Sequence, residues 1–162
     1  MAVSSDMIRT WAAPRRVMRG LLSQGQREDR ALAYLMVGCL LVFIAQWPRL
    51  SRIAHLEGQE FIQLVGYSFV GIMIVWPLAF YILTLILFAL MRGFGQRIEI
   101  WQVRLATFWA FLAAAPAGLL YGLTVAFVGP GGAAQLVGAV WLIALAVFVV
   151  QGLRESGQGD GG

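Results

Sequence analysis

Charged side chains are scarce in this sequence. Only 12% of its 162 residues are Asp, Glu, Lys or Arg, whereas 60% are hydrophobic, and the mean hydropathy is +0.78. A soluble domain of this length carries about 25% charged residues. Lysine is absent, so all twelve basic residues are arginines, and they gather at the ends of apolar runs. This pattern predicts an integral membrane protein and speaks against nucleic acid as a partner.

Residues that commonly carry catalysis or bind metals are equally scarce. Cys39 is the single cysteine, which excludes an internal disulfide and a multi-cysteine metal site. His55 is the single histidine, and no nucleophile motif accompanies it. It lies near Glu57 and Glu60 in the segment HLEGQE, but the spacing fits no standard metal site, so we interpret the segment as a solvated loop. We therefore predict no catalytic residue, metal or cofactor, and we predict that the protein is not an enzyme.

Four long apolar runs follow residue 30, and charged residues are missing from their interiors, which argues against ion-coupled transport. The runs cover residues 31–47, 61–91, 103–128 and 133–151. Pro48 predicts the end of the first, because the residue before a proline disfavours a helix. The second exceeds what a ~30 Å hydrocarbon core requires, which predicts one helix that is tilted or kinked near Pro77. The segment GPGG at 129–132 predicts a tight turn.

These runs predict an all-α membrane protein with four transmembrane helices plus an N-terminal amphipathic surface helix. The expected organisation is a cytoplasmic N-terminal segment (1–30), a transmembrane domain (31–153) and a flexible, Gly-rich tail (154–162). The longest loops between helices are expected at 49–60 and 92–102.

The first 30 residues hold six arginines and lack the apolar core of a cleaved signal peptide, so we expect the first span to be retained. Pro14 suits the first position of a helix, and the segment PRRVMRGLLS that it begins is amphipathic. Its apolar residues share one face, whereas Arg15, Arg16 and Arg19 lie off that face. We interpret the segment as a helix in the membrane surface with these arginines toward anionic headgroups. The alternative is a helix packed on another protein.

The arginines also predict an orientation. With four spans, the N-terminal segment, the loop at 92–104 and the C-terminal tail share one side and hold ten arginines, against Arg49 and Arg52 on the other. Because positive residues concentrate on the cytoplasmic side, both termini are expected to be cytoplasmic.

Small residues recur at every fourth position of the third run, from Ala106 to Ala126. Helices in lipid associate by close packing, and small residues let two backbones approach. We therefore predict a helix-packing face, with the fourth helix and its small pair Ala134 and Gly138 as the expected neighbour. The face comprises Ala106, Ala110, Ala114, Gly118, Gly122 and Ala126.

The segments APRRVMRGLL and REDRALAYLMVGCLLVFIAQWPRL carry a family resemblance. A proline followed by a short amphipathic helix, then a charged turn leading into a first span that ends in QWPR, resembles bacterial members of the YIP1 family of integral membrane proteins. Proteins of that family are often drawn with five spans, whereas this sequence predicts four and a surface helix. The resemblance implies a polytopic protein of the bacterial inner membrane that acts through protein or lipid contacts.

Three functional hypotheses remain open. The first is a non-enzymatic scaffold or membrane-organising protein that acts through helix–helix and lipid contacts, with membrane lipid and either a protein partner or a second copy as its partners. The second is an accessory subunit of a larger energy-transducing membrane complex. The third is a transporter or enzyme for an uncharged, lipid-like substrate.

Overall fold

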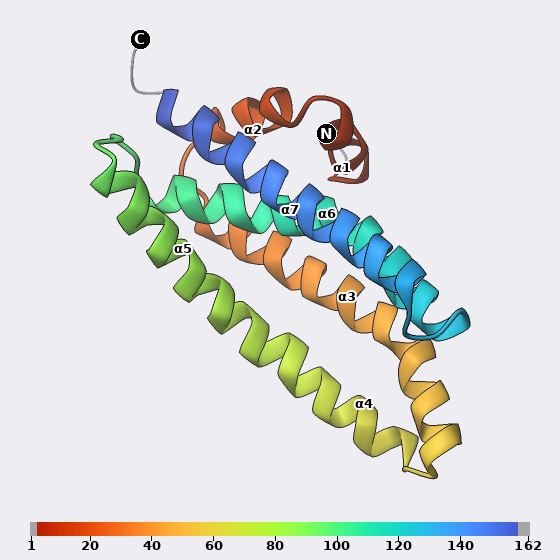
Figure 1. Ribbon diagram of the computed structural model, residues 1–162. Coiled ribbons are helices and arrows are strands. Elements are labelled where there is room, and N and C mark those ends of the chain that lie inside the picture. Colours follow the sequence, from red (N-terminus) through yellow and green to blue (C-terminus); the bar gives the residue numbers. More distant parts are fainter. Residues whose placement is uncertain (1–2, 159–162) are drawn as a thin grey trace.

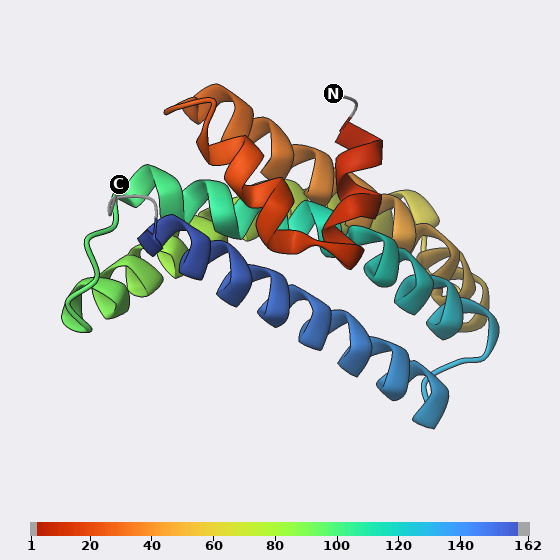
Figure 2. The same cartoon turned by 90° about the horizontal axis from the view of Figure 1, so that it is seen from above.

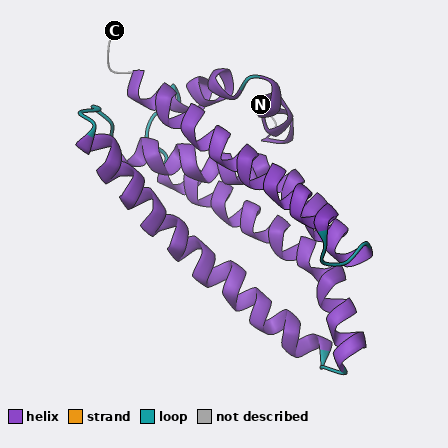
Figure 3. Cartoon of the chain, viewed as in Figure 1, coloured by secondary structure: helices purple, strands orange, loops and turns teal. Residues whose placement is uncertain are grey.

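The computed structural model describes residues 3–158, which are almost entirely helical and contain no strand (Figures 1 and 3). The elements in chain order are α1 (Val3–Ala12), α2 (Pro14–Leu22), α3 (Glu28–Glu57), α4 (Phe61–Val70), the π-helical η1 (Gly71–Val75), α5 (Trp76–Gly93), α6 (Ile100–Phe127) and α7 (Gly132–Gln158).

Four helices are long and apolar enough to cross a membrane: Glu28–Glu57, Phe61–Gly93, Ile100–Phe127 and Gly132–Gly157. The fold class predicted from the sequence is therefore confirmed. The connections at 58–60 and 128–131 lie at one end of the bundle, whereas the connection at 94–99 and the end of α7 lie at the other (Figure 1).

Helix α6 is the centre of the bundle. Every residue from Leu105 to Ala115 is buried, because α3, α5 and α7 pack around this helix and the N-terminal helices cover part of it. A helix that is apolar on all sides is stable only when neighbours enclose it or lipid surrounds it. Here neighbours enclose it, and the remaining spans are more exposed than α6. Of the most apolar 18 residues in each span, 56% are buried in α6, but only 17% in α4–α5 and 17% in α7.

Helix α3 does not end at Trp47, where the proline predicted its end. It continues through Pro48 to Glu57 and stops at Gly58, whose φ of +64° gives the left-handed conformation that ends many helices. Proline removes one helical hydrogen bond, but membrane helices tolerate this loss when neighbouring groups compensate it. Residues 49–57, predicted as a loop, therefore form the last turns of α3, and Figure 1 shows this end of α3 bending away from α6 and α7.

The long second run forms one continuous helix, α4–η1–α5. A π-helical turn precedes Pro77, and the N–H of Trp76 bonds the carbonyl of Gly71, five residues back. Because proline clashes with the carbonyl four residues before it, a wider turn lets the helix pass the proline without breaking.

The flexible tail was predicted from residue 154, but the chain is still helical there. Helix α7 extends to Gln158, and both Glu155 and Ser156 are buried. The Ser156 hydroxyl donates to the carbonyl of Gly152 at 2.9 Å. Only residues 159–162 of the predicted tail lie outside the described residues.

Candidate interaction surfaces

The predicted packing face of α6 meets two neighbours. At one end, Ala106 lies against Gly152 of α7, where a Cβ on the glycine would come within 3.0 Å of the Ala106 Cβ. Gly118 faces the ring of Trp141, also on α7. At the other end, Gly122 approaches the backbone of α3 so closely that a Cβ there would overlap the carbonyl oxygen of Ala45.

Helix geometry explains why the neighbour changes. Four residues turn an α-helix by about 400°, so each step along the row rotates the next small residue by about 40°. The row of small residues therefore winds around α6, and its contacts change from α7 to α3. The fourth helix, predicted as the neighbour of the whole row, contacts only part of it. Ala110 and Ala114 are fully buried, whereas Ala126 is partly exposed. Of the matching pair expected on α7, Gly138 lies against the ring of Tyr121, and Ala134 is buried.

The apolar face of α2 packs against the chain's own helices. Val17, Met18 and Leu21 are buried, and the Met18 methyl group would lie 3.5 Å from a Cβ on Gly152. Both views place α1 and α2 against α6 and α7 (Figures 1 and 2). The sequence predicted that this apolar face contacts the membrane surface, and that prediction is wrong. The face contacts α7 instead, where Gly152 has no side chain and leaves room for Met18.

Two of the three predicted membrane-surface arginines tie α2 to α7. The Arg15 Nε donates to Gln151 Oε1 at 2.6 Å, and the Arg19 Nε lies 2.6 Å from Glu155 Oε1. The Glu155 side chain is only 7% exposed, and its hydrogen bond and charge raise the pKa of Arg19 above its ordinary value. The spacing of four residues in both helices makes these pairs successive rungs of one contact.

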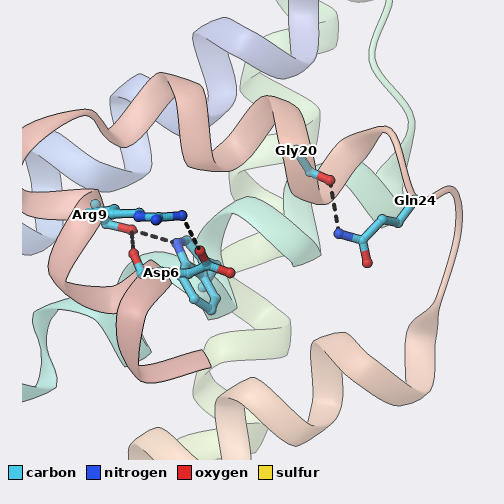
Figure 4. A network of polar contacts seen from close by, with 6 residues as sticks. Asp6, Arg9, Gly20 and Gln24 are labelled. Carbon is cyan, nitrogen blue, oxygen red and sulfur yellow. Dashed lines mark hydrogen bonds and ion pairs between the residues drawn. The ribbon is translucent and has the colours of Figure 1, made fainter. Parts of the chain in front are cut away.

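The third of these arginines, Arg16, remains exposed and lines a groove of about 500 Å³ between α1 and α2. Figure 4 shows the polar side of these helices: Arg9 lies 3.9 Å from Asp6 on α1, and the amide of Gln24 donates to the carbonyl of Gly20 at 3.0 Å. The predicted contact of Arg16 with lipid headgroups stays a prediction.

Helix α1 reaches the middle of α6, which the sequence reading missed. The Trp11 indole donates to the carbonyl of Ala113 at 3.0 Å, and the Trp109 indole donates to the Thr10 hydroxyl at 3.1 Å. Ala113 lies about 20 Å along α6 from its first residue, so α1 contacts α6 near its middle and not at its end. Pro116 frees the carbonyl of Leu112, one residue before Ala113, and so marks this stretch of α6 as irregular, but nothing in the sequence points to Trp11 as the partner.

A second groove, of about 410 Å³, lies at the opposite end of the bundle, between the last turns of α3, the end of α6 and the start of α7. Arg49 and Arg52, the two arginines that the orientation argument places apart from the rest, line it. The sequence reading used them only as markers of orientation, because it placed both in a loop.

The HLEGQE segment does not form a metal site in the structure. Among the described residues, no three His, Cys, Asp or Glu side chains lie close enough together to hold a metal ion. His55, Glu57 and Glu60 are all exposed, and Glu57 accepts a hydrogen bond of 3.0 Å from Gln59.

Comparisons with models of known protein families, with curated proteins and with solved structures give no match.

Proposed function

We propose that the chain is a non-enzymatic polytopic protein of a bacterial inner membrane that acts through helix–helix and lipid contacts. In this role it would organise the membrane or hold a partner, as the resemblance to the YIP1 family implies. The observation that supports this most directly is the unequal enclosure of the four long helices. Helix α6 is enclosed by its neighbours, whereas most of α4–η1–α5 lies open along its length.

The length of α4–η1–α5 makes this open helix a candidate association surface. Its 33 residues extend about 50 Å, whereas the hydrocarbon core is about 30 Å thick. Tilt alone would have to reach about 50° to keep the whole helix in lipid, beyond the 0–40° range that spanning helices show. The mismatch is relieved by local thickening of the bilayer or by a partner that covers the surplus length. Either outcome changes the surroundings of the protein, which is what a membrane-organising protein does.

Two acidic residues that pack against the long helices support a non-enzymatic role, because each forms an ion pair that joins two helices. Glu155 pairs with Arg19, and Glu28 pairs with Arg104 at 3.0 Å across the ends of α3 and α6. Ionisable groups held at membrane depth usually mark transport or proton-transfer sites, but these two carboxylates hold helices together instead.

Capture of the protein from native membranes in mild detergent, followed by native mass spectrometry, tests the proposal. The matched variants remove equally exposed apolar side chains: Ile74→Ala with Leu78→Ala on η1 and α5, against Leu142→Ala with Ile143→Ala on α7. We expect a partner or second copy that is lost only from the first pair. A single partner at fixed stoichiometry would favour the accessory-subunit hypothesis. A lone monomer with the same bound lipid in both variants would refute association through α4–α5.

The proposed orientation, with both termini cytoplasmic, is tested separately by cysteine labelling. In a Cys39→Ala background, Ser51→Cys at the end of α3 and Gln96→Cys between α5 and α6 are both exposed. An impermeant maleimide applied to intact spheroplasts should label only the cysteine at 51. Labelling of position 96 alone would reverse the orientation, and labelling of both would refute the four-span topology.

A further inference from the structure

We propose that the groove between α3, α6 and α7 binds the phosphate headgroup of an anionic phospholipid. This inference rests on the proposed membrane location. Its lining includes Arg49, Arg52 and Glu57 of α3 together with the apolar parts of Ile53, Tyr121 and Val125. The lining combines cationic and apolar side chains, which matches the two parts of a phospholipid.

The continuation of α3 through Pro48 creates the cationic part of the lining. Arg49 and Arg52 lie three residues apart on one helix, so their side chains leave the same face about one turn apart. In the loop predicted at 49–60, the two guanidinium groups would have no fixed position relative to each other. Arg49 and Arg52 therefore share one face only because α3 continues past Pro48.

Arg52 is held in place and still has donors to spare. Its Nη1 donates to the carbonyl of Ala126 in the last turn of α6 at 3.0 Å. The turn after α6 passes close by, since a Cβ on Gly129 would lie 3.5 Å from the same nitrogen. A guanidinium has five N–H donors in a planar fork, and one bond to a carbonyl leaves most of them for a phosphate.

No carboxylate within residues 3–158 neutralises the two arginines through an ion pair. Arg49 makes only a long contact of 3.5 Å to Gln46 Oε1, and Glu57, the one acid that lines the groove, accepts its hydrogen bond from Gln59. Arg49, Arg52 and Glu57 together leave one positive charge. The start of α7 adds to it, because the N–H groups of a first helical turn have no acceptor inside the helix.

The apolar part of the lining explains why the occupant is a lipid. Ile53, Val125 and Tyr121 face the groove, and the Tyr121 ring is held by stacking on Trp141 at 6.2 Å between ring centroids. Leu136, the residue after Gln135 of the lining, is 71% exposed and adds apolar surface beside the groove. A free anion would gain nothing from these apolar contacts, whereas a glycerol backbone and the first part of an acyl chain would.

The test is native mass spectrometry of the purified protein released from nanodiscs that contain equal amounts of phosphatidylglycerol and phosphatidylcholine. We expect wild type to retain phosphatidylglycerol preferentially, and the double variant Arg49→Gln with Arg52→Gln to lower that retention by about tenfold. The control is Arg92→Gln with Arg97→Gln, two exposed arginines at the other end of the bundle. This control should retain the lipid as wild type does.

Three results would overturn the proposal. Equal retention of both lipids by wild type would remove the anion preference, and equal loss in the test and control variants would reduce it to general charge. Displacement of phosphatidylglycerol by millimolar inorganic phosphate would assign the groove to a free anion. Arg52→Lys, which keeps the charge but not the fork, should retain an intermediate amount of lipid, and its unfolding transition shows whether the fold survives. Partner capture through α4–α5 is measured independently, so that proposed function can stand when this inference fails.

Discussion

Gly122 on α6 is the position at which one added methyl group should disturb the bundle most. Gly122→Ala would place its Cβ against the backbone of α3, overlapping the carbonyl oxygen of Ala45 and lying within 3.1 Å of the Ala45 Cβ. A backbone carbonyl inside a helix cannot rotate away as a side chain can. The two helices must therefore separate locally along a contact in which α6 is buried.

The expected size of the effect follows from two opposing terms. Overpacking of a tight contact costs about 1–3 kcal/mol, whereas replacing a helical glycine by alanine gains about 0.5–1 kcal/mol. Because the overlap at Gly122 is with backbone, the cost should lie in the upper part of its range, and Gly122→Ala should lose up to about 2.5 kcal/mol of stability. At Gly66 on α4, a Cβ would meet nothing within 4 Å, so Gly66→Ala should gain up to about 1 kcal/mol. Gly118→Ala should fall between them, because it meets the Trp141 side chain at 3.1 Å, and a ring can shift.

Unfolding in mixed detergent micelles with rising SDS measures all three variants on one scale. We expect the midpoint to fall for Gly122→Ala, to change little for Gly118→Ala and to rise for Gly66→Ala. Equal midpoints for the substitutions at 122 and 66 would refute the close approach of α6 to α3 at this point. A larger loss at 118 than at 122 would indicate that α7, and not α3, makes the tightest contact with α6.

Three further predictions concern the N-terminal helices and the core. Trp11→Phe keeps the ring but loses the bond to Ala113, so amide hydrogen exchange in residues 3–22 should speed up several-fold, as for a lost bond of about 1 kcal/mol. Glu155→Gln removes the charge that holds Arg19 and should speed exchange in the same residues. An arginine is charged at pH 10 without any help, and Glu155 raises the pKa of Arg19 further, so wild-type protection should not fall between about pH 7 and about pH 10. Trp141→Phe removes a buried indole N–H that has no partner among the described residues, so the SDS midpoint should stay level or rise, and a clear fall would show that the ring contacts with Gly118 and Tyr121 outweigh the unpaired N–H.

The fold class could be predicted from the sequence because it depends on quantities that the sequence states directly. The lengths of the apolar runs set the number of long helices, and lipid or a helical partner is the only surrounding in which such runs are stable. The sequence also indicated in part which long helix lies at the centre of the bundle. The run from Ala106 to Ala126 is rich in small residues, and small residues allow a helix to be approached from several sides.

The position of the N-terminal helices could not be predicted, because amphipathicity states that a face is apolar and not what covers it. The sequence pattern of α2 is the same for a helix on lipid and for a helix on a neighbouring bundle. What distinguishes the two here is a set of distant partners: Gly152 beneath Met18, and Glu155 beside Arg19. These pairs are separated by more than a hundred residues, and no local pattern relates them.

The groove between α3, α6 and α7 was not predicted either, because Pro48 predicted the end of the first long helix. In water a proline inside a helix costs about 3 kcal/mol, which makes it a sound predictor of a helix end. Near a membrane, the alternative to continuing the helix is to expose unbonded backbone to an environment with little water, which costs several kcal/mol for each group. The balance therefore tips toward a helix that passes Pro48, and Arg49 and Arg52 acquire a common direction beside the end of α6. The rule that a proline ends a helix holds for soluble helices, and here it wrongly placed Arg49 and Arg52 in a loop. For that reason the sequence did not predict the groove that these two arginines line.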